Sequence, residues 1–305
     1  MIKTSVRAVV AAAPAALLLF APAAADAQAK PVGWTTTANL SGVFAGGNSA
    51  ATSFGLKART ERNWLRTQYF LEGGGIRQDA TDISRYAVGV PGAFTVTEID
   101  TKSTKAENYY AETGFMRRVT ERFFWELGGG YKRDLFSGVE QLWSGRAGVG
   151  YYWTDRSAQD LKLGLAATYN HQKEKVPDPA TKESFAGARV TAEYALKFGD
   201  TKQSQFASKL ALDENRQVTD DLRSNWENTL TVSLNRRLAL QLGGKWAYRN
   251  LPALQEVPLF ATAPAPGANS DQKALAPYKK SDFWLTVSLV INWGPAGPSG
   301  AKPTP

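Results

Sequence analysis

No cysteine occurs in this 305-residue chain. The absence excludes a disulfide framework and catalysis by a thiolate, and it suits export to an oxidising compartment, where a stray thiol is a liability. Histidine is almost as scarce, because His171 is the only one. A hydrolase with a histidine base would depend on His171, and the alternation of its segment places it on the apolar face, beyond Tyr169. We interpret His171 as a solvated residue near a loop and predict that the protein is not an enzyme.

Motifs for metals, nucleotides and nucleic acids are missing as well. The chain has no cysteine and histidine cluster, and DENRQVTDD at residues 213–221 lacks the pattern of a calcium loop. Gly148-Val149-Gly150 is not followed by a helical pattern, so it is not a nucleotide loop. The net charge is +8, yet no basic run carries an RNA-binding signature. We expect no metal, cofactor or nucleic acid, and an anionic neighbour such as lipopolysaccharide or a solute instead.

Long apolar runs are absent beyond the amino terminus, which excludes a transmembrane helix there. At the amino terminus, Lys3 and Arg7 precede an alanine-rich apolar run, and Ala25-Asp26-Ala27 has the form of a cleavage site. These features predict a cleaved signal peptide at residues 1–27, with residue 29 as the other cleavage position. Two prolines in the run disfavour the alternative of a membrane anchor. The protein is therefore expected to be exported.

The rest of the chain alternates between apolar and polar residues with the period of a β-strand. In LALQLGGKWAYRN, residues 238–250, leucines and aromatics share one face, while glycine and charged residues share the other. About twelve such segments of roughly ten residues occur, which is the length of a tilted membrane-crossing strand. They cover residues 34–44, 53–61, 65–72, 109–115, 123–132, 143–153, 161–170, 189–198, 205–213, 226–234, 238–249 and 283–293.

The connections between these segments alternate in length. Short connections such as WTDRSAQD and LNRRL alternate with longer ones, among them residues 77–105 and 250–281, and only the hairpin at AGGNSA departs from this order. Short turns at one end and long loops at the other are typical of an outer-membrane barrel. A soluble β-sandwich also alternates, but its strands are shorter and it lacks aromatic girdles. The sequence predicts an all-β fold, an antiparallel transmembrane β-barrel of about 12 strands over residues 28–293, in the bacterial outer membrane.

Three stretches of the chain also resemble a known family. They are WTTTANLSGVFAGGNS, ERFFWELGGGYKRDLFSGVEQLWSGRAGVGYYWTD and WENTLTVSLNRRLALQLGGKWAYRNLP. They are similar to the opening, the middle signature and the penultimate hairpin of the bacterial salt-induced outer membrane protein family, a β-barrel family filed as a domain of unknown function. The resemblance spans most of residues 34–293. It implies an outer-membrane barrel and supplies no substrate or reaction.

The carboxyl terminus departs from that family, whose members end on an aromatic residue. Trp293 could fill this role, but GPAGPSGAKPTP follows it at residues 294–305. The composition of this tail predicts disorder. We also expect the chain to be a monomer that contacts outer-membrane lipid and lipopolysaccharide, and the barrel assembly machinery during insertion.

The polar parity of the strands supplies the candidate functional residues. A barrel of twelve strands lies between closed eight-stranded barrels and wide porins, so we expect a narrow channel for small solutes. A structural or envelope-stress barrel without transport and, less favoured, an outer-membrane hydrolase are the alternatives. Glu112, Glu126 and Glu193 could form a catalytic carboxylate pair, although an ion-paired wall fits their basic neighbours better. Basic residues outnumber acidic ones on this parity, which predicts a preference for anions. The candidates for lining the lumen are Lys57, Arg59, Glu112, Glu126, Arg146, Lys162, Arg189, Glu193, Lys209, Lys245 and Arg249.

Overall fold

The computed structural model describes residues 32–46, 51–178, 181–199, 204–235, 237–262 and 270–293. The expected signal peptide at residues 1–27 and the expected tail at residues 294–305 lie outside the described residues. In the described part of the chain, no helix is long and apolar enough to cross a membrane. Among these residues, one short 3-10 helix, η2 (Leu135–Ser137), interrupts the strands and turns.

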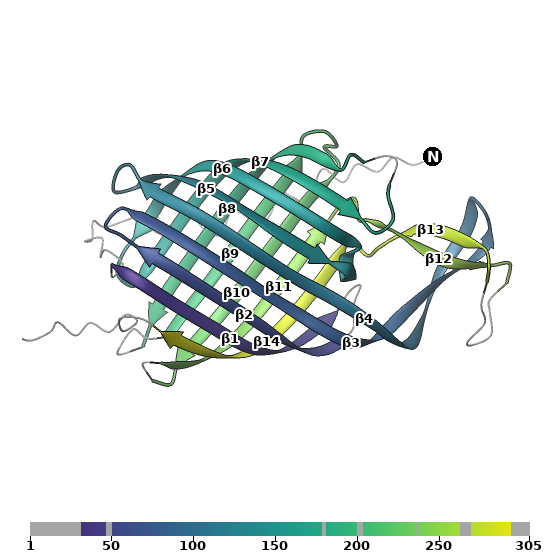
Figure 1. The fold of residues 1–305 in the computed structure, drawn as a ribbon, viewed down its shortest axis with the longest axis horizontal. Coiled ribbons are helices and arrows are strands. Elements are labelled where there is room, and N and C mark those ends of the chain that lie inside the picture. The colour runs from purple at the N-terminus through teal and green to yellow at the C-terminus, as the bar shows by residue number, and fades with distance from the viewer. Residues whose placement is uncertain are drawn as a thin grey trace, which may run out of the picture.

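The strands form one antiparallel barrel (Figure 1). The sheet has 14 strands, and all except β12 and β13 belong to the barrel, which therefore has twelve. The long pairing of β3 with β4 closes the ring. Each segment expected from the alternation corresponds to a strand, so the predicted fold and strand number are confirmed. The barrel strands are β1 (Gly33–Gly46), β2 (Ala51–Asn63), β3 (Thr67–Val90), β4 (Ala93–Arg118), β5 (Phe123–Asp134), β6 (Val139–Asp155), β7 (Gln159–Glu174), β8 (Ser184–Phe198), β9 (Ser204–Asn215), β10 (Leu222–Ser233), β11 (Leu238–Arg249) and β14 (Ser281–Trp293).

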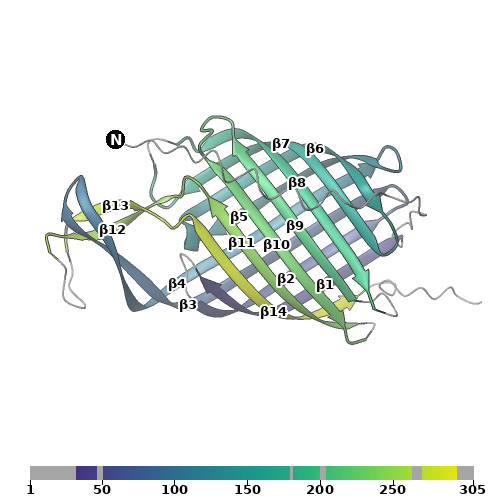
Figure 2. The same cartoon turned by 180° about the vertical axis from the view of Figure 1, so that it is seen from behind.

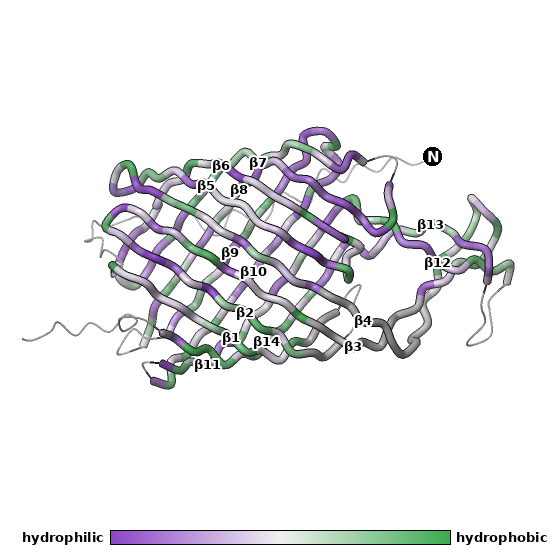
Figure 3. The backbone as a smooth tube through the Cα atoms, viewed as in Figure 1, coloured by the Kyte–Doolittle hydropathy of each residue, from purple (hydrophilic) through white to green (hydrophobic). Residues whose placement is uncertain are grey.

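The two faces of the barrel wall differ in chemistry, as residues along the strands alternate in hydropathy (Figure 3). On β11, Leu240 and Leu242 are 48% and 46% exposed, whereas Ala239 on the opposite face is 1% exposed. Leu230 and Val287 continue the exposed apolar surface on the two neighbouring strands. An apolar band of this extent around a closed barrel is the surface of a transmembrane protein, because water would penalise it and lipid does not.

One end of the barrel carries the long connections together with the short β1–β2 and β5–β6 connections, whereas all the connections at the other end are short turns. Hydrogen bonds such as Arg156 N–H to Gln159 O (2.8 Å) and Leu234 N–H to Leu238 O (2.9 Å) close two of them. The first strand begins and the last strand ends at this same end, where Thr36 pairs with Trp293. The predicted asymmetry of short and long connections is therefore present. We call the end with the long connections the outer mouth.

The two longest connections are not loops, which corrects the sequence analysis. Residues 77–105 were expected to be loop, but β3 and β4 continue through most of them to a tight turn in which Gly92 has φ +85°. Residues 250–281 contain a hairpin of β12 (Leu254–Phe260) and β13 (Lys273–Pro277). β12 pairs in parallel with β3, and buried Ala87, Val257 and Leu259 form a small core there. Both hairpins project together beyond the outer mouth (Figure 2).

Candidate functional site in the barrel lumen

The inner face of the barrel is lined by ion pairs that join neighbouring strands. On β2 and β3, Lys57 and Arg59 both contact Glu72, at 2.9 and 3.2 Å. On β7, β8 and β9, Glu193 lies between Lys162 at 2.6 Å and Lys209 at 3.4 Å. The carboxylate of Glu193 is therefore held by two ammonium groups in the wall. This arrangement agrees with an ion-paired lining and not with a free catalytic carboxylate.

Two further pairs extend the lining. Arg189 donates to both carboxylate oxygens of Asp213, at 2.6 and 3.2 Å, and Lys245 lies 3.5 Å from Glu227. Like the first pairs, these two join neighbouring strands of the wall.

Three of the predicted lining residues form no ion pair in the described part of the chain. They are Glu112 on β4, Glu126 on β5 and Arg146 on β6. The guanidinium of Arg146 lies flat against Gly128, where an added Cβ would approach its Cζ to 2.8 Å. A side chain at this position would displace the guanidinium of Arg146 from the wall. The structure thus places every predicted lining residue on the inner parity, while their role in lining a passage stays a prediction.

Acidic residues that were left out of the sequence count alter the charge balance. Asp134, Glu174, Asp221 and Glu227 each pair with a base that faces the interior or its outer mouth. Because Arg223, which pairs with Asp221, was left out of the count as well, these acids reduce the surplus of positive charge without removing it. Glu227 could have been counted from its parity alone. The other three lie at strand ends or in a loop, where alternation no longer shows which way a side chain points.

Aromatic rings also point inward, which the sequence analysis missed. Phe124 and Tyr152 are 2% and 6% exposed, and their ring centroids lie 5.3 Å apart. Arg118 stacks on Tyr152 at 4.0 Å, and Lys162 lies over Phe124 at 5.7 Å. Such contacts fill part of the lumen at the end with the short turns, and cation–π attraction orders the basic side chains there.

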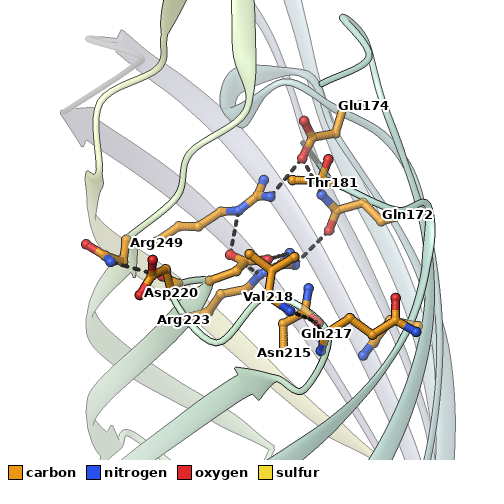
Figure 4. Close-up of polar contacts among 12 residues, drawn as sticks. Gln172, Glu174, Thr181, Asn215, Gln217, Val218, Asp220, Arg223 and Arg249 are labelled. Carbon is orange, nitrogen blue, oxygen red and sulfur yellow. Dashed lines mark hydrogen bonds and ion pairs between the residues drawn. The ribbon is translucent and has the colours of Figure 1, made fainter. Parts of the chain in front are cut away.

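At the outer mouth, five residues form a polar cluster that we call the mouth latch (Figure 4). Arg249 on β11 contacts Glu174 on β7 at 2.8 Å, and Arg223 on β10 donates to Gln172 on β7 at 2.7 Å. Asp221, from the β9–β10 loop, accepts from both arginines, with Nε to Oδ1 distances of 3.1 and 3.2 Å. The latch therefore joins β7 to β10 and β11.

Burial distinguishes these contacts from surface ion pairs, because removing one partner would leave a buried charge uncompensated. The side chain of Asp221 is 1% exposed and that of Glu174 is 7% exposed. Burial alone raises the pKa of Asp221, but hydrogen bonds and charge from Arg223 and Arg249 outweigh it and hold the pKa below its usual value. Asp221 is therefore ionised at neutral pH. One group in the latch is not satisfied, because Nη1 of Arg249 is buried and has no hydrogen-bond partner among the described residues.

A second bridge crosses above the latch. We call it the mouth strap, residues 250–253 and 278–280, which connect β11 and β14 to the projecting hairpin. The strap reaches Gly138, between β5 and β6 on the opposite side of the ring. A Cβ on Gly138, whose φ is +76°, would lie 2.6 Å from the Tyr278 ring and 3.0 Å from Cβ of Ala253. Part of the long 250–281 connection therefore lies over the mouth.

His171 lies outside the barrel, on the apolar parity that the sequence predicted, although within β7 and not in a loop. Its Nδ1 lies 2.9 Å from the hydroxyl of Ser184 on β8. No carboxylate among the described residues hydrogen-bonds the ring, so nothing orients the imidazole as a triad requires. The described residues also contain no group of three or more metal-ligating side chains that could hold an ion.

The fold and its lining define a class, a twelve-stranded transmembrane β-barrel with a polar and charged interior. The family model described as "Protein of unknown function, DUF481" matches residues 38–257, and the chain belongs to this family. This confirms the resemblance to a barrel family of unknown function, while the salt-induced description stays a prediction. No curated protein matches the chain.

Solved structures of barrels are similar in architecture. The NanC porin shares 7% identity over 83% of this chain and 98% of that chain, with a TM-score of 0.48. An anion-selective porin from Comamonas acidovorans shares 8% identity over 87% of this chain and 100% of that chain, with a TM-score of 0.38. The CymD monoaromatic hydrocarbon channel shares 6% identity over 87% and 89%, with a TM-score of 0.41. Similarities this low carry no argument about the function of this chain.

Proposed function

We propose that the protein is a bacterial outer-membrane β-barrel that acts as a narrow channel for small polar solutes, and that it is not an enzyme. The observation that supports this proposal most is the charged lining of the barrel. Ion pairs such as Lys57–Glu72 and Lys162–Glu193 line the interior, while the exterior is apolar. A lining of this kind supports a hydrated passage, because ionised groups keep favourable interactions with water. The surplus of bases is small once these acids are counted, so we infer weak charge selectivity with only a slight preference for anions.

The experiment is a conductance measurement on the purified, folded barrel in planar lipid bilayers. Small, stable current steps are expected in potassium chloride, with a reversal potential close to zero in a salt gradient. Failure to conduct would favour the alternative, a structural or envelope-stress barrel without transport. A deletion strain that then grows poorly under osmotic or solute stress would indicate a structural role in the envelope, and normal growth would indicate none.

A further inference from the structure

We propose that the mouth latch is the constriction that limits the size of the solutes that enter the lumen. The proposal rests on the channel function, because a constriction matters only where solutes pass. It concerns the outer mouth, where Gln172, Glu174, Arg223 and Arg249, which Figure 4 labels, meet. Asp221 joins them there by its hydrogen bonds to both arginines.

The latch spans the lumen instead of following the wall. β7 and β11 are four strands apart in the ring, which is about 19 Å along the wall at the usual strand spacing. Ordinary lining pairs, such as Arg189–Asp213, join adjacent strands. The Glu174–Arg249 contact joins strands a third of the way around the barrel, so its side chains lie across the opening.

Further contacts fix the side chains of the latch in position. Asp221 accepts hydrogen bonds from both arginines. Gln172 Nε2 donates to Glu174 at 2.7 Å, so the two β7 side chains are bonded to each other. Arg223 lies over the ring of Phe185 on β8 at 5.2 Å. A network in which each member is fixed by another loses little entropy on closing, so it is expected to persist and not to fluctuate open.

The mouth strap leaves little room for a route around the latch. Only about 14 Å of extended chain separates Arg249 from Ala253, yet Ala253 touches Gly138 on the far side of the ring. A cavity of about 160 Å³ remains beside the latch, lined by Glu174, Asp178 and Arg249 among others. Arg249, whose buried Nη1 has no hydrogen-bond partner among the described residues, is one of the side chains that line this cavity.

The cysteine-free chain allows a direct test by thiol labelling. Asn225→Cys places a thiol on β10 on the inner parity, two residues below Arg223. Intact cells that express the full chain are treated with a bulky sulfonated dye maleimide that does not cross membranes. Lys273→Cys on β13, where the native side chain is 62% exposed, reports free access from outside. Ser157→Cys in a short turn reports entry of the reagent into the periplasm and should stay unlabelled.

With the latch intact, labelling of Asn225→Cys should be at least tenfold slower than labelling of Lys273→Cys. Replacing the β7 half of the latch, by Gln172→Ala with Glu174→Ala, should accelerate it at least tenfold, while Asp221 still holds the arginines and preserves the fold. Lys173→Ala is the matched control, because Lys173 lies between these residues, points outward and pairs with Glu140 at 3.2 Å. Heat-modifiable gel mobility confirms that each variant is folded.

Equal labelling rates with and without the β7 half of the latch would overturn the proposal, whether both are fast or both are slow. Labelling does not require a current, so this result is independent of the bilayer measurement. If the latch variant opens the lumen to the dye but the barrel conducts nothing, the constriction stands and the channel function fails.

Discussion

An arginine placed on the outer face of the wall should destabilise the barrel far more than one placed inside at the same depth. Leu242 is the best outer position, because it lies near the middle of β11 and pairs with Leu230 and Val287, which are also exposed and apolar. Thr229 is the matched inner position. It pairs with Gly243, the residue next to Leu242, and shares the inner parity of Glu227.

The magnitude follows from depth in the bilayer. Arginine on the lipid face costs about 2 to 4 kcal/mol at the midplane and about 0 to 1 kcal/mol near the interfaces. Leu242→Arg should therefore cost about 2 to 4 kcal/mol, and Leu240→Arg less, because Leu240 lies two residues nearer the short turn. Thr229→Arg should cost under about 1 kcal/mol, because the new charge enters a polar lumen close to Glu227.

Reversible unfolding by urea in lipid vesicles measures these free energies, with tryptophan fluorescence as the signal from the nine tryptophans. Equal costs for Leu242→Arg and Thr229→Arg would refute the assignment of lipid and lumen faces. A larger cost for Thr229→Arg would mean that the lumen is dry.

Other predictions address orientation, the wall, acid sensitivity and the exterior histidine. A protease site inserted at Asp178 should be cleaved from outside intact cells and one at Ser157 should not, and the reverse pattern would invert the topology. Glu193→Gln should destabilise the barrel by about 1 to 2 kcal/mol in the same unfolding assay, less than a fully buried pair, because 32% of the Glu193 side chain is exposed. The labelling rate of Asn225→Cys in purified barrels, divided by that of Lys273→Cys to cancel the loss of thiolate in acid, should not change between pH 8 and 5. This ratio should rise only below the ordinary Asp221 pKa of 3.8, because Arg223 and Arg249, facing Asp221 with Glu174 nearby, lower that pKa. Opening near pH 6 would show that another group controls the latch. His171→Ala should leave folding and conductance unchanged, and lipid or peptide hydrolysis lost with it would revive the hydrolase alternative.

The barrel could be predicted because strand alternation is a local property. Leu240 and Gln241 differ in parity, and parity alone assigned one to lipid and the other to the interior, where Gln241 hydrogen-bonds Asn39 and Thr231. The projecting hairpins were missed for a different reason. Residues 77–105 and 250–281 fall on the long-loop side of the alternating connections and were expected to be loops, and the pairing of β12 with β3 joins residues far apart in the chain.

The mouth latch could not be predicted from the sequence. Glu174 and Arg249 are distant in the chain and are not neighbours in the sheet, so neither spacing nor parity connects them. Asp221 lies in a loop whose inward path is fixed by hydrogen bonds such as Asp221 N–H to Val218 O (2.8 Å) and Asn250 Nδ2 to Asp220 O (2.9 Å). Such contacts depend on barrel curvature and loop packing, which the local pattern does not encode.

Conductance of the folded barrel across a planar bilayer tests the central claim most directly, with wild type compared with the Gln172→Ala, Glu174→Ala variant. A channel limited at its outer mouth predicts small steps for the wild type, larger steps for the variant and weak charge selectivity in both. Folded protein that inserts into the bilayer and passes no current in either form would contradict the account.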